Sequence, residues 1–355
     1  MRPIQASIDL NALRHNLQVV RTLAPKSLVM AVVKANGYGH GLLTVAQGLS
    51  KADGFAVLGL NEGITLREAG FSQTILMLEG VFHPSELQAV SDADISVTVH
   101  NEAQVIMLEQ AMLRKPVNIF VKMNNGMNRL GFRPEDYAKI IRRLEACRNV
   151  RGITLMSHFA MADEISGITE PLKRFQEATR VLDYPISLAN SAAILRHPET
   201  HVDWVRPGIM LYGANAVSEM PASECDLLPV MTLTSSIIAL QTLLPGESVG
   251  YGGLYTATKK TRVGVVACGY ADGYPRHAPT GTPVMVADQM TRIIGRVSMD
   301  MLCVDLTDIP DAMVGSSVEL WGKRIPVDMV AERAGTIGYE LLCALSQRVP
   351  IKVLN

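Results

Sequence analysis

The sequence has no excess of charge of either sign, few aromatic residues and no long hydrophobic run. Lys and Arg number 33 against 34 Asp and Glu, the formal net charge is -1, and aromatic residues make up 5% of the chain. This balance gives no overall attraction for nucleic acid or for an anionic membrane surface. The longest apolar runs, such as residues 28–33 and 230–233, are far shorter than the roughly 20 residues of a membrane-spanning helix. We therefore expect a small-molecule partner, with no nucleic acid and no membrane.

Cysteine is scarce and shows no metal or disulfide pattern. The five cysteines are Cys147, Cys225, Cys268, Cys303 and Cys343. Their number is odd, they are widely spaced and none belongs to a Cys-x-x-Cys pair, so we expect neither a disulfide framework nor a zinc site. His197 and His201 have i,i+4 spacing, but no glutamate completes a His-Glu-x-x-His frame, so we expect no metal.

The N-terminus lacks the pattern of a secretory signal. Gln5, Ser7 and Asp9 interrupt the apolar stretch that a signal peptide needs. We therefore expect the protein to reside in the cytoplasm.

The length and composition are typical of a folded protein of two domains. The chain has 355 residues, of which 48% are hydrophobic and 19% charged, and its mean hydropathy is +0.18. From residue 28 to about 210, eight short apolar runs alternate with segments of helical spacing, which favours a parallel (β/α)8 TIM-like barrel over an open doubly wound sheet. After about residue 227, strand-like runs follow one another directly. The sequence thus predicts an α/β protein with a barrel domain over residues 1–227 and a mostly β domain over residues 228–355.

The most informative segment is residues 31–41, AVVKANGYGHG. Lys34 follows a buried apolar run, and a residue at the end of a barrel strand lies at the C-terminal mouth, where barrel enzymes have their active sites. Partial desolvation there would favour a neutral, nucleophilic amine. A lone strand-end lysine more often reaches solvent, but the three glycines that follow allow a ligand to approach the backbone closely. The segment is no P-loop, because it lacks the GxxxxGK[ST] pattern.

Further motifs follow this segment in order along the chain. They are residues 121–132 (VKMNNGMNRLGF), 156–160 (MSHFA), 188–193 (LANSAA), 204–213 (WVRPGIMLYG), 250–252 (GYG), 267–276 (ACGYADGYPR), 295–300 (GRVSMD) and 334–340 (AGTIGYE). Together with residues 31–41, they resemble the motifs of the bacterial alanine racemases, enzymes of fold type III that use pyridoxal 5'-phosphate (PLP). The resemblance covers nearly the whole chain and implies an isomerase that interconverts L-alanine and D-alanine. It also implies a homodimer whose active site is shared between the subunits.

The resemblance assigns the proton chemistry to two residues. Racemisation needs a base on each face of the planar reacting carbon. Lys34, the residue that binds PLP, would act on the hydrogen of D-alanine, and Tyr251 of the partner subunit on that of L-alanine. Because a free tyrosine has a pKa of about 10, Tyr251 needs cationic or donor neighbours, and His158 and Arg206 are implied in that role. Arg206 would also lie beside the pyridine nitrogen of PLP. Its charge there would disfavour protonation of that nitrogen and so weaken PLP as an electron sink.

Other residues are implied in binding. For PLP these are Tyr38, Arg129, Ser191, Tyr339 and the backbone N–H groups of Gly208 and Ile209. The substrate carboxylate would meet Arg129 and the backbone N–H of Met299. The substrate entrance would be lined by Tyr270, Arg276, Arg296 and Ile337. Two alternatives stay open from the residues themselves: Ser191 could cap a helix, and Lys122 could be carbamylated or form a structural ion pair.

Departures from the family pattern are few. Some members have Asp-Thr where this chain has Asn124-Asn125, and some have Cys in place of Ser298; neither change removes a group that the proton chemistry needs. The alternatives are an amino-acid racemase of broader specificity, a PLP decarboxylase of the same fold and a non-catalytic PLP-binding protein. A narrow entrance beside Tyr251 and Tyr339 favours the small methyl group of alanine. Both the supply of D-alanine for peptidoglycan and the degradation of alanine are compatible with these residues.

Overall fold

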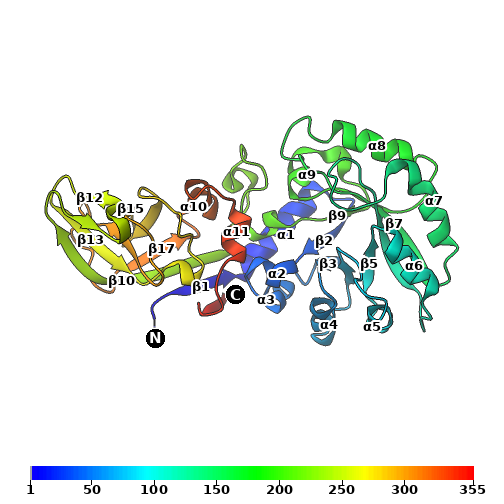
Figure 1. The fold of residues 1–355 in the computed structure, drawn as a ribbon, viewed down its shortest axis with the longest axis horizontal. Coiled ribbons are helices and arrows are strands. Elements are labelled where there is room, and N and C mark those ends of the chain that lie inside the picture. The colour runs from blue at the N-terminus through cyan, green and yellow to red at the C-terminus, as the bar shows by residue number, and fades with distance from the viewer. Residues whose placement is uncertain (1) are drawn as a thin grey trace.

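The first half of the chain forms a closed parallel barrel. A computed structural model describes residues 2–355, and in it the barrel and a second domain lie side by side along the long axis of the molecule (Figure 1). The barrel strands, in order, are β2 (Leu28–Val32), β3 (Gly54–Val57), β4 (Thr74–Met77), β5 (Ser96–Val99), β6 (Val117–Lys122), β7 (Val150–Met156), β8 (Ile186–Ser187) and β9 (Trp204–Val205). Pairing of β2 with β9 closes the ring. The predicted (β/α)8 barrel is confirmed.

Helices surround the barrel and follow its strands. They are α1 (Leu10–Leu23), α3 (Leu42–Gly48), α4 (Leu60–Glu68), α5 (Glu86–Asp92), α6 (Glu102–Gln110), α7 (Pro134–Glu145), α8 (Thr169–Thr179) and α9 (Ser191–Arg196). Helix α7 illustrates why they form: Pro134 occupies its first turn, acidic residues stand near its N-terminus and arginines in its last turn. Its buried face includes Tyr137, whose hydroxyl donates to the carbonyl of Val121 on β6 at 2.6 Å. This hydrogen bond fixes α7 against the end of β6, which carries part of the site.

The second domain is built on an eight-stranded sheet of order β13-β16-β15-β14-β17-β10-β1-β18. Its strands are β1 (Gln5–Asp9), β10 (Met231–Leu243), β13 (Thr261–Val266), β14 (Pro283–Val286), β15 (Gln289–Ile294), β16 (Leu302–Asp305), β17 (Ser317–Trp321) and β18 (Ile351–Leu354). A separate hairpin joins β11 (Ser248–Val249) to β12 (Tyr255–Thr256). The mostly β character predicted for this half is confirmed. Strands β1 and β18 were not predicted; Ala6 pairs with both Leu233 and Ile351, so both chain ends belong to this sheet.

Two short helices connect the sheet with the barrel mouth. They are α10 (Val327–Arg333) and α11 (Gly338–Cys343), and α11 lies between the sheet and the barrel in Figure 1. A side chain at Gly39 would collide with the backbone carbonyl of Leu342, so α11 packs directly on the turn that follows β2. Across residues 2–355, every helix is too short or too polar to cross a membrane.

Candidate active site

Lys34 stands at the start of a strained turn after β2. The turn is labelled α2 (Lys34–Tyr38), but Ala35, Asn36 and Gly37 have φ values of 54°, 54° and 61°. Left-handed backbone costs roughly 1–2 kcal/mol for each residue with a side chain, and such strain is typical of functional sites. Nδ1 of His40 lies 3.1 Å and 2.8 Å from the carbonyl oxygens of Gly37 and Tyr38. Because both partners are acceptors, Nδ1 carries the proton and His40 stabilises the turn.

Tyr38 lies over a group of neutral hydrogen-bonding atoms at the ends of β8 and β9. A side chain at Gly208 would come within 2.7 Å of the Tyr38 hydroxyl oxygen. Ser191 Oγ accepts from the backbone N–H of Gly208 at 2.8 Å, and within residues 2–355 the N–H of Ile209 donates no hydrogen bond. Asn190, rather than Ser191, caps α9, because its side chain accepts from Ala193. The Ser191 hydroxyl is thus left to the same cluster, which suits a phosphate held by neutral donors.

Three tyrosines form the aromatic wall of this cluster. The ring of Tyr38 stacks on that of Tyr212 with centroids 4.5 Å apart, and the Tyr339 ring lies 6.0 Å from it. The Tyr212 hydroxyl donates to the carbonyl of Val32 at 2.9 Å and so ties the wall to β2. Burial raises the pKa of both Tyr38 and Tyr339, so their hydroxyls stay protonated donors at neutral pH. No role was predicted for Tyr212, although it lies in the motif 204–213.

Arg206 is a buried cation without a carboxylate partner in the described part of the chain. Its Nη1 donates to Ser187 Oγ at 2.7 Å, and its Nη2 donates to the carbonyls of Ser157 at 2.6 Å and Leu188 at 3.1 Å. Burial lowers the pKa of Arg206 to about 10, which leaves it charged at neutral pH. Nη2 therefore donates both of its hydrogens, while Nε and the second hydrogen of Nη1 form no hydrogen bond within residues 2–355 and can meet other acceptors.

Lys122 and His158 share this environment at the ends of β6 and β7. Lys122 is buried, and across residues 2–355 its Nζ forms no ion pair, so the structural ion pair considered for it is absent there. Burial and the charges of Arg206, Arg129 and Lys34 lower its pKa to about 8. Burial and the same cations, with Lys122, lower the pKa of His158 to about 3, so the imidazole is neutral. No hydrogen bond joins His158 to Arg206 in the described chain.

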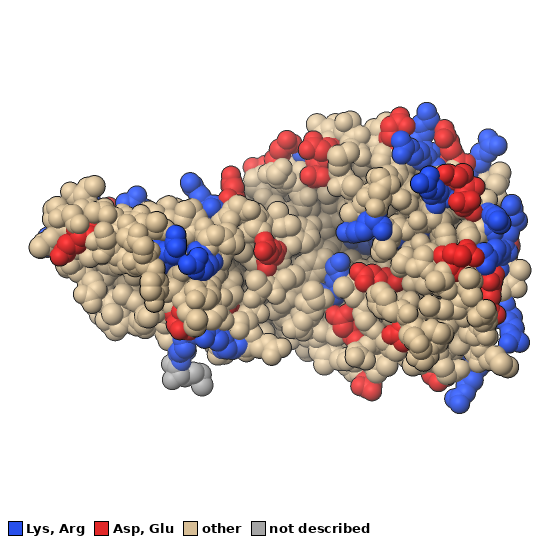
Figure 2. All heavy atoms as spheres, viewed as in Figure 1, with Lys and Arg blue, Asp and Glu red and all other residues tan. Residues whose placement is uncertain are grey.

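Arg129 completes the cluster from the loop after β6. Its side chain is exposed, and its charge acts on both Lys122 and His158. Asn124 shapes the loop by accepting from the N–H groups of Gly126 and Asn128. Figure 2 shows lysine and arginine side chains on the barrel side of a hollow between the two domains. The cations of this cluster form no ion pair within residues 2–355, although the charge of Glu79 also acts on Lys122, and a ligand with phosphate and carboxylate groups would supply them with anionic partners.

Most of the residues expected from the second domain are exposed in the single chain. Tyr251, in the turn between β11 and β12, is 71% exposed and its hydroxyl forms no hydrogen bond within residues 2–355. Gly250 packs near the backbone of Arg296. The N–H of Tyr270 donates to the carbonyl of Ser298, which precedes Met299. Arg276, Tyr270 and Ile337 are exposed, and Arg296 is half-buried. They belong to the second domain, whose helix α11 packs against the turn after β2.

Comparison with known proteins gives one family for both halves of the chain. The alanine racemase N-terminal domain model matches residues 8–216, and the alanine racemase C-terminal domain model matches residues 230–353. A catabolic alanine racemase of Klebsiella aerogenes is 55% identical over 354 residues, which are 99% of each protein, and an alanine racemase of Erwinia tasmaniensis is 53% identical over 352 residues, again 99% of each. The crystal structure of the biosynthetic alanine racemase from Pseudomonas aeruginosa matches with a TM-score of 0.98 and 44% identity over all of both chains. This chain belongs to the alanine racemase family.

Proposed function

We propose that the protein is a PLP-dependent alanine racemase whose barrel mouth holds the cofactor and whose active site is completed by a second copy of the chain. The observation that carries this proposal is a group of cations, Lys34, Lys122, Arg129 and Arg206, that form no ion pair within residues 2–355, next to the neutral donors of Tyr38, Ser191 and Ile209. Relatives at 55% identity are named catabolic, which supports alanine degradation as the physiological role.

The residues present fit the cofactor group by group. Lys34 would bind it covalently, and Tyr339 would join the neutral donor cluster at the phosphate. The free Nε of Arg206 suits the pyridine nitrogen, and Arg129 suits the phenolic oxygen and the substrate carboxylate. When bound, PLP acts as an electron sink that acidifies the α-hydrogen of alanine. A guanidinium beside the pyridine nitrogen disfavours its protonation, which restrains side reactions such as transamination.

Two bases on opposite faces would move the α-hydrogen. The amine of Lys34 would take it from D-alanine, and the phenolate oxygen of Tyr251 of the partner subunit would take it from L-alanine. The low pKa of His158 supports this assignment, because a neutral imidazole can accept a hydrogen bond from Arg206 and donate one to the Tyr251 oxygen. The positive charge of Arg206 would then favour the phenolate without transferring a proton itself.

Exposed apolar side chains on the second domain support a homodimer. Tyr251, Leu254, Met299, Met301 and Ile337 are all exposed in the single chain. Contiguous exposed apolar patches mark interaction surfaces. A second copy laid across its partner's barrel mouth would cover them and bring Tyr251, with the entrance residues Tyr270, Arg276 and Arg296, to the partner's Lys34.

The function is tested by proton NMR of the purified protein with PLP and L-alanine in D2O. We expect the α-proton signal and the optical activity of the recovered alanine to disappear together. Cofactor binding without loss of the α-proton would contradict the proposal and indicate a non-catalytic PLP-binding protein. Comparable racemisation of serine, lysine or arginine would replace it with an enzyme of broader specificity.

We also propose that Lys122 is carbamylated. Its lowered pKa of about 8 leaves a substantial fraction of neutral amine at neutral pH. The neutral Nζ would attack the carbon of carbon dioxide, form a nitrogen–carbon bond and release one proton to solvent. The carbamate carries a negative charge where a protonated lysine carries a positive one, and it would give Arg129 and Arg206 an anionic partner.

Carbamylation predicts a carbamate signal in carbon NMR of protein equilibrated with isotope-labelled bicarbonate. The signal should vanish in Lys122→Gln. It should persist in the control Lys26→Gln, because Lys26 is exposed and distant in sequence from β6. If the wild-type protein shows no carbamate signal, or if the signal survives in Lys122→Gln, this modification at Lys122 is excluded.

A further inference from the structure

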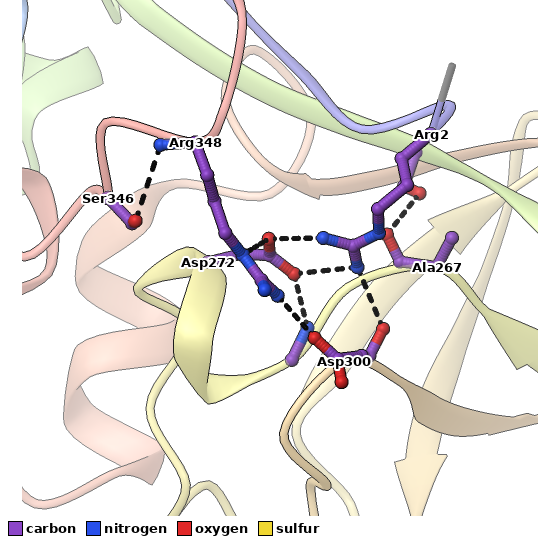
Figure 3. A network of polar contacts seen from close by, with 8 residues as sticks. Arg2, Ala267, Asp272, Asp300, Ser346 and Arg348 are labelled. Carbon is purple, nitrogen blue, oxygen red and sulfur yellow. Dashed lines mark hydrogen bonds and ion pairs between the residues drawn. The ribbon is translucent and has the colours of Figure 1, made fainter.

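A network of ion pairs ties both ends of the chain to two turns of the second domain. The buried carboxylate of Asp272 accepts from Arg2 Nη1 at 2.6 Å and Nη2 at 3.0 Å, and from Arg348 Nε at 2.7 Å (Figure 3). The arginines also reach Asp300: Arg348 Nη2 donates to its Oδ1 at 2.6 Å, and Arg2 Nη2 donates to its backbone carbonyl at 2.9 Å. Burial alone would raise the pKa of Asp272, but the hydrogen bonds from Arg2 and Arg348 bring it below its usual value.

The network holds together two turns that are distant in sequence. Asp272 ends the short helix η5 (Tyr270–Asp272), and its Oδ2 accepts from the N–H of Gly269 at 2.9 Å. The N–H groups of Tyr270 and Ala271 donate to the carbonyls of Ser298 and Met299, each at 3.0 Å. Gly269 lies against the same two carbonyls so closely that a side chain there would collide with both. The turn that carries Met299 is therefore fixed by η5 on one side and by the arginines at Asp300 on the other.

This fixation leaves the backbone N–H of Met299 free. The carbonyl of Met299 is occupied by Ala271, but its N–H donates no hydrogen bond within residues 2–355, and the Met299 side chain is 52% exposed. An unpaired N–H on a rigid turn can bind an anion without first rearranging the backbone. The substrate of the proposed reaction supplies such an anion in its carboxylate.

We infer that Asp272, acting with Arg2 and Arg348, is a positioning residue that sets the Met299 N–H for the carboxylate of the substrate in the partner subunit's site. The inference rests on the proposed function and deepens it. Buried ion pairs add little net stability compared with apolar packing, but charge-assisted hydrogen bonds fix geometry closely. Here the hydrogen bonds of Asp272 fix the Met299 turn, the segment proposed to bind the substrate through its backbone. Asp272, Arg2 and Arg348 themselves do not contact the reacting atoms.

The test uses the full-length enzyme with PLP and the variants Asp272→Asn and Arg348→Gln. Propionate, which has the carboxylate of alanine but no amine, serves as a competitive probe. We expect its inhibition constant and the KM for alanine to rise about tenfold, while kcat changes by less than about threefold, because the carboxylate contact is lost and the bases are not moved. The matched control is Arg324→Gln, which removes an exposed ion pair with Asp288 in the same domain and should leave the inhibition constant unchanged.

A purely structural role gives a different pattern. It would lower the melting temperature and the fraction of active enzyme, and the propionate inhibition constant would stay at the wild-type value; that result overturns the inference. If Asp272→Asn does not fold, Arg348→Gln decides, because this side chain is 39% exposed and Arg2 still pairs with Asp272. Failure of the wild-type enzyme to exchange the α-hydrogen of alanine would instead overturn the proposed function.

Discussion

Replacement of Lys34 by alanine should abolish both the visible absorbance of covalently bound PLP and the racemase activity. The side chain stands on the left-handed turn after β2, among Arg206, Lys122 and Arg129, and it is proposed both to bind the cofactor and to act as a base. Removal of a base alone costs up to about 10⁴-fold in rate, and loss of the covalent link adds to that. We therefore expect at least a 10⁴-fold fall in kcat, measured with both enantiomers of alanine.

The control for this experiment is Lys26→Ala, which removes an exposed lysine that precedes β2. It should retain the absorbance and the wild-type rate. Circular dichroism of Lys34→Ala should match the wild type, because the removed side chain makes no hydrogen bond within the described chain. Racemisation that persists in Lys34→Ala would contradict the covalent role.

Replacement of Tyr251 by phenylalanine should separate the two directions of proton removal. L-alanine and D-alanine have equal free energies, so kcat/KM for racemisation must fall equally from either side. The asymmetry appears instead in the exchange of the α-hydrogen with D2O. With Lys34 intact, the variant should exchange the hydrogen of D-alanine and retain its configuration, whereas exchange from L-alanine should fall by about 10²–10⁴-fold.

The matched control is Tyr255→Phe, a change in the same hairpin on strand β12. It should leave both exchange rates near those of the wild type and should keep PLP bound, as should Tyr251→Phe itself. Equal losses of exchange from the two enantiomers of alanine in Tyr251→Phe would argue against the two-base assignment. Because Tyr251 is proposed to act in the partner subunit's site, this asymmetric loss is expected only of the dimer.

Local sequence patterns determined the elements of the barrel and the residue types at its mouth. Alternation of short apolar runs with helical spacing predicted the eight strands, and strand β6 (Val117–Lys122) has the bounds expected for it. Strand β5 also ends where the apolar run of residues 95–99 ends, whereas the other barrel strands end before their apolar runs do; residues 204–209, for example, give only the strand Trp204–Val205. The position of Lys34 after a buried strand was sufficient to place it at the C-terminal mouth, since a parallel barrel presents all its strand ends there.

Tertiary structure decided which partners those residues have. Asn190 caps α9 and leaves Ser191 to Gly208, and Lys122 forms no ion pair within residues 2–355 but lies in the field of three other cations. The ends of the chain, which show no separate strand signal, become strands because β10 offers an edge to β1, and β1 in turn offers one to β18. These outcomes depend on residues brought together from distant parts of the chain. The periodicity of a sequence reports only which face of a segment is buried, whereas charge pairing and sheet order depend on what the folded chain places against that face.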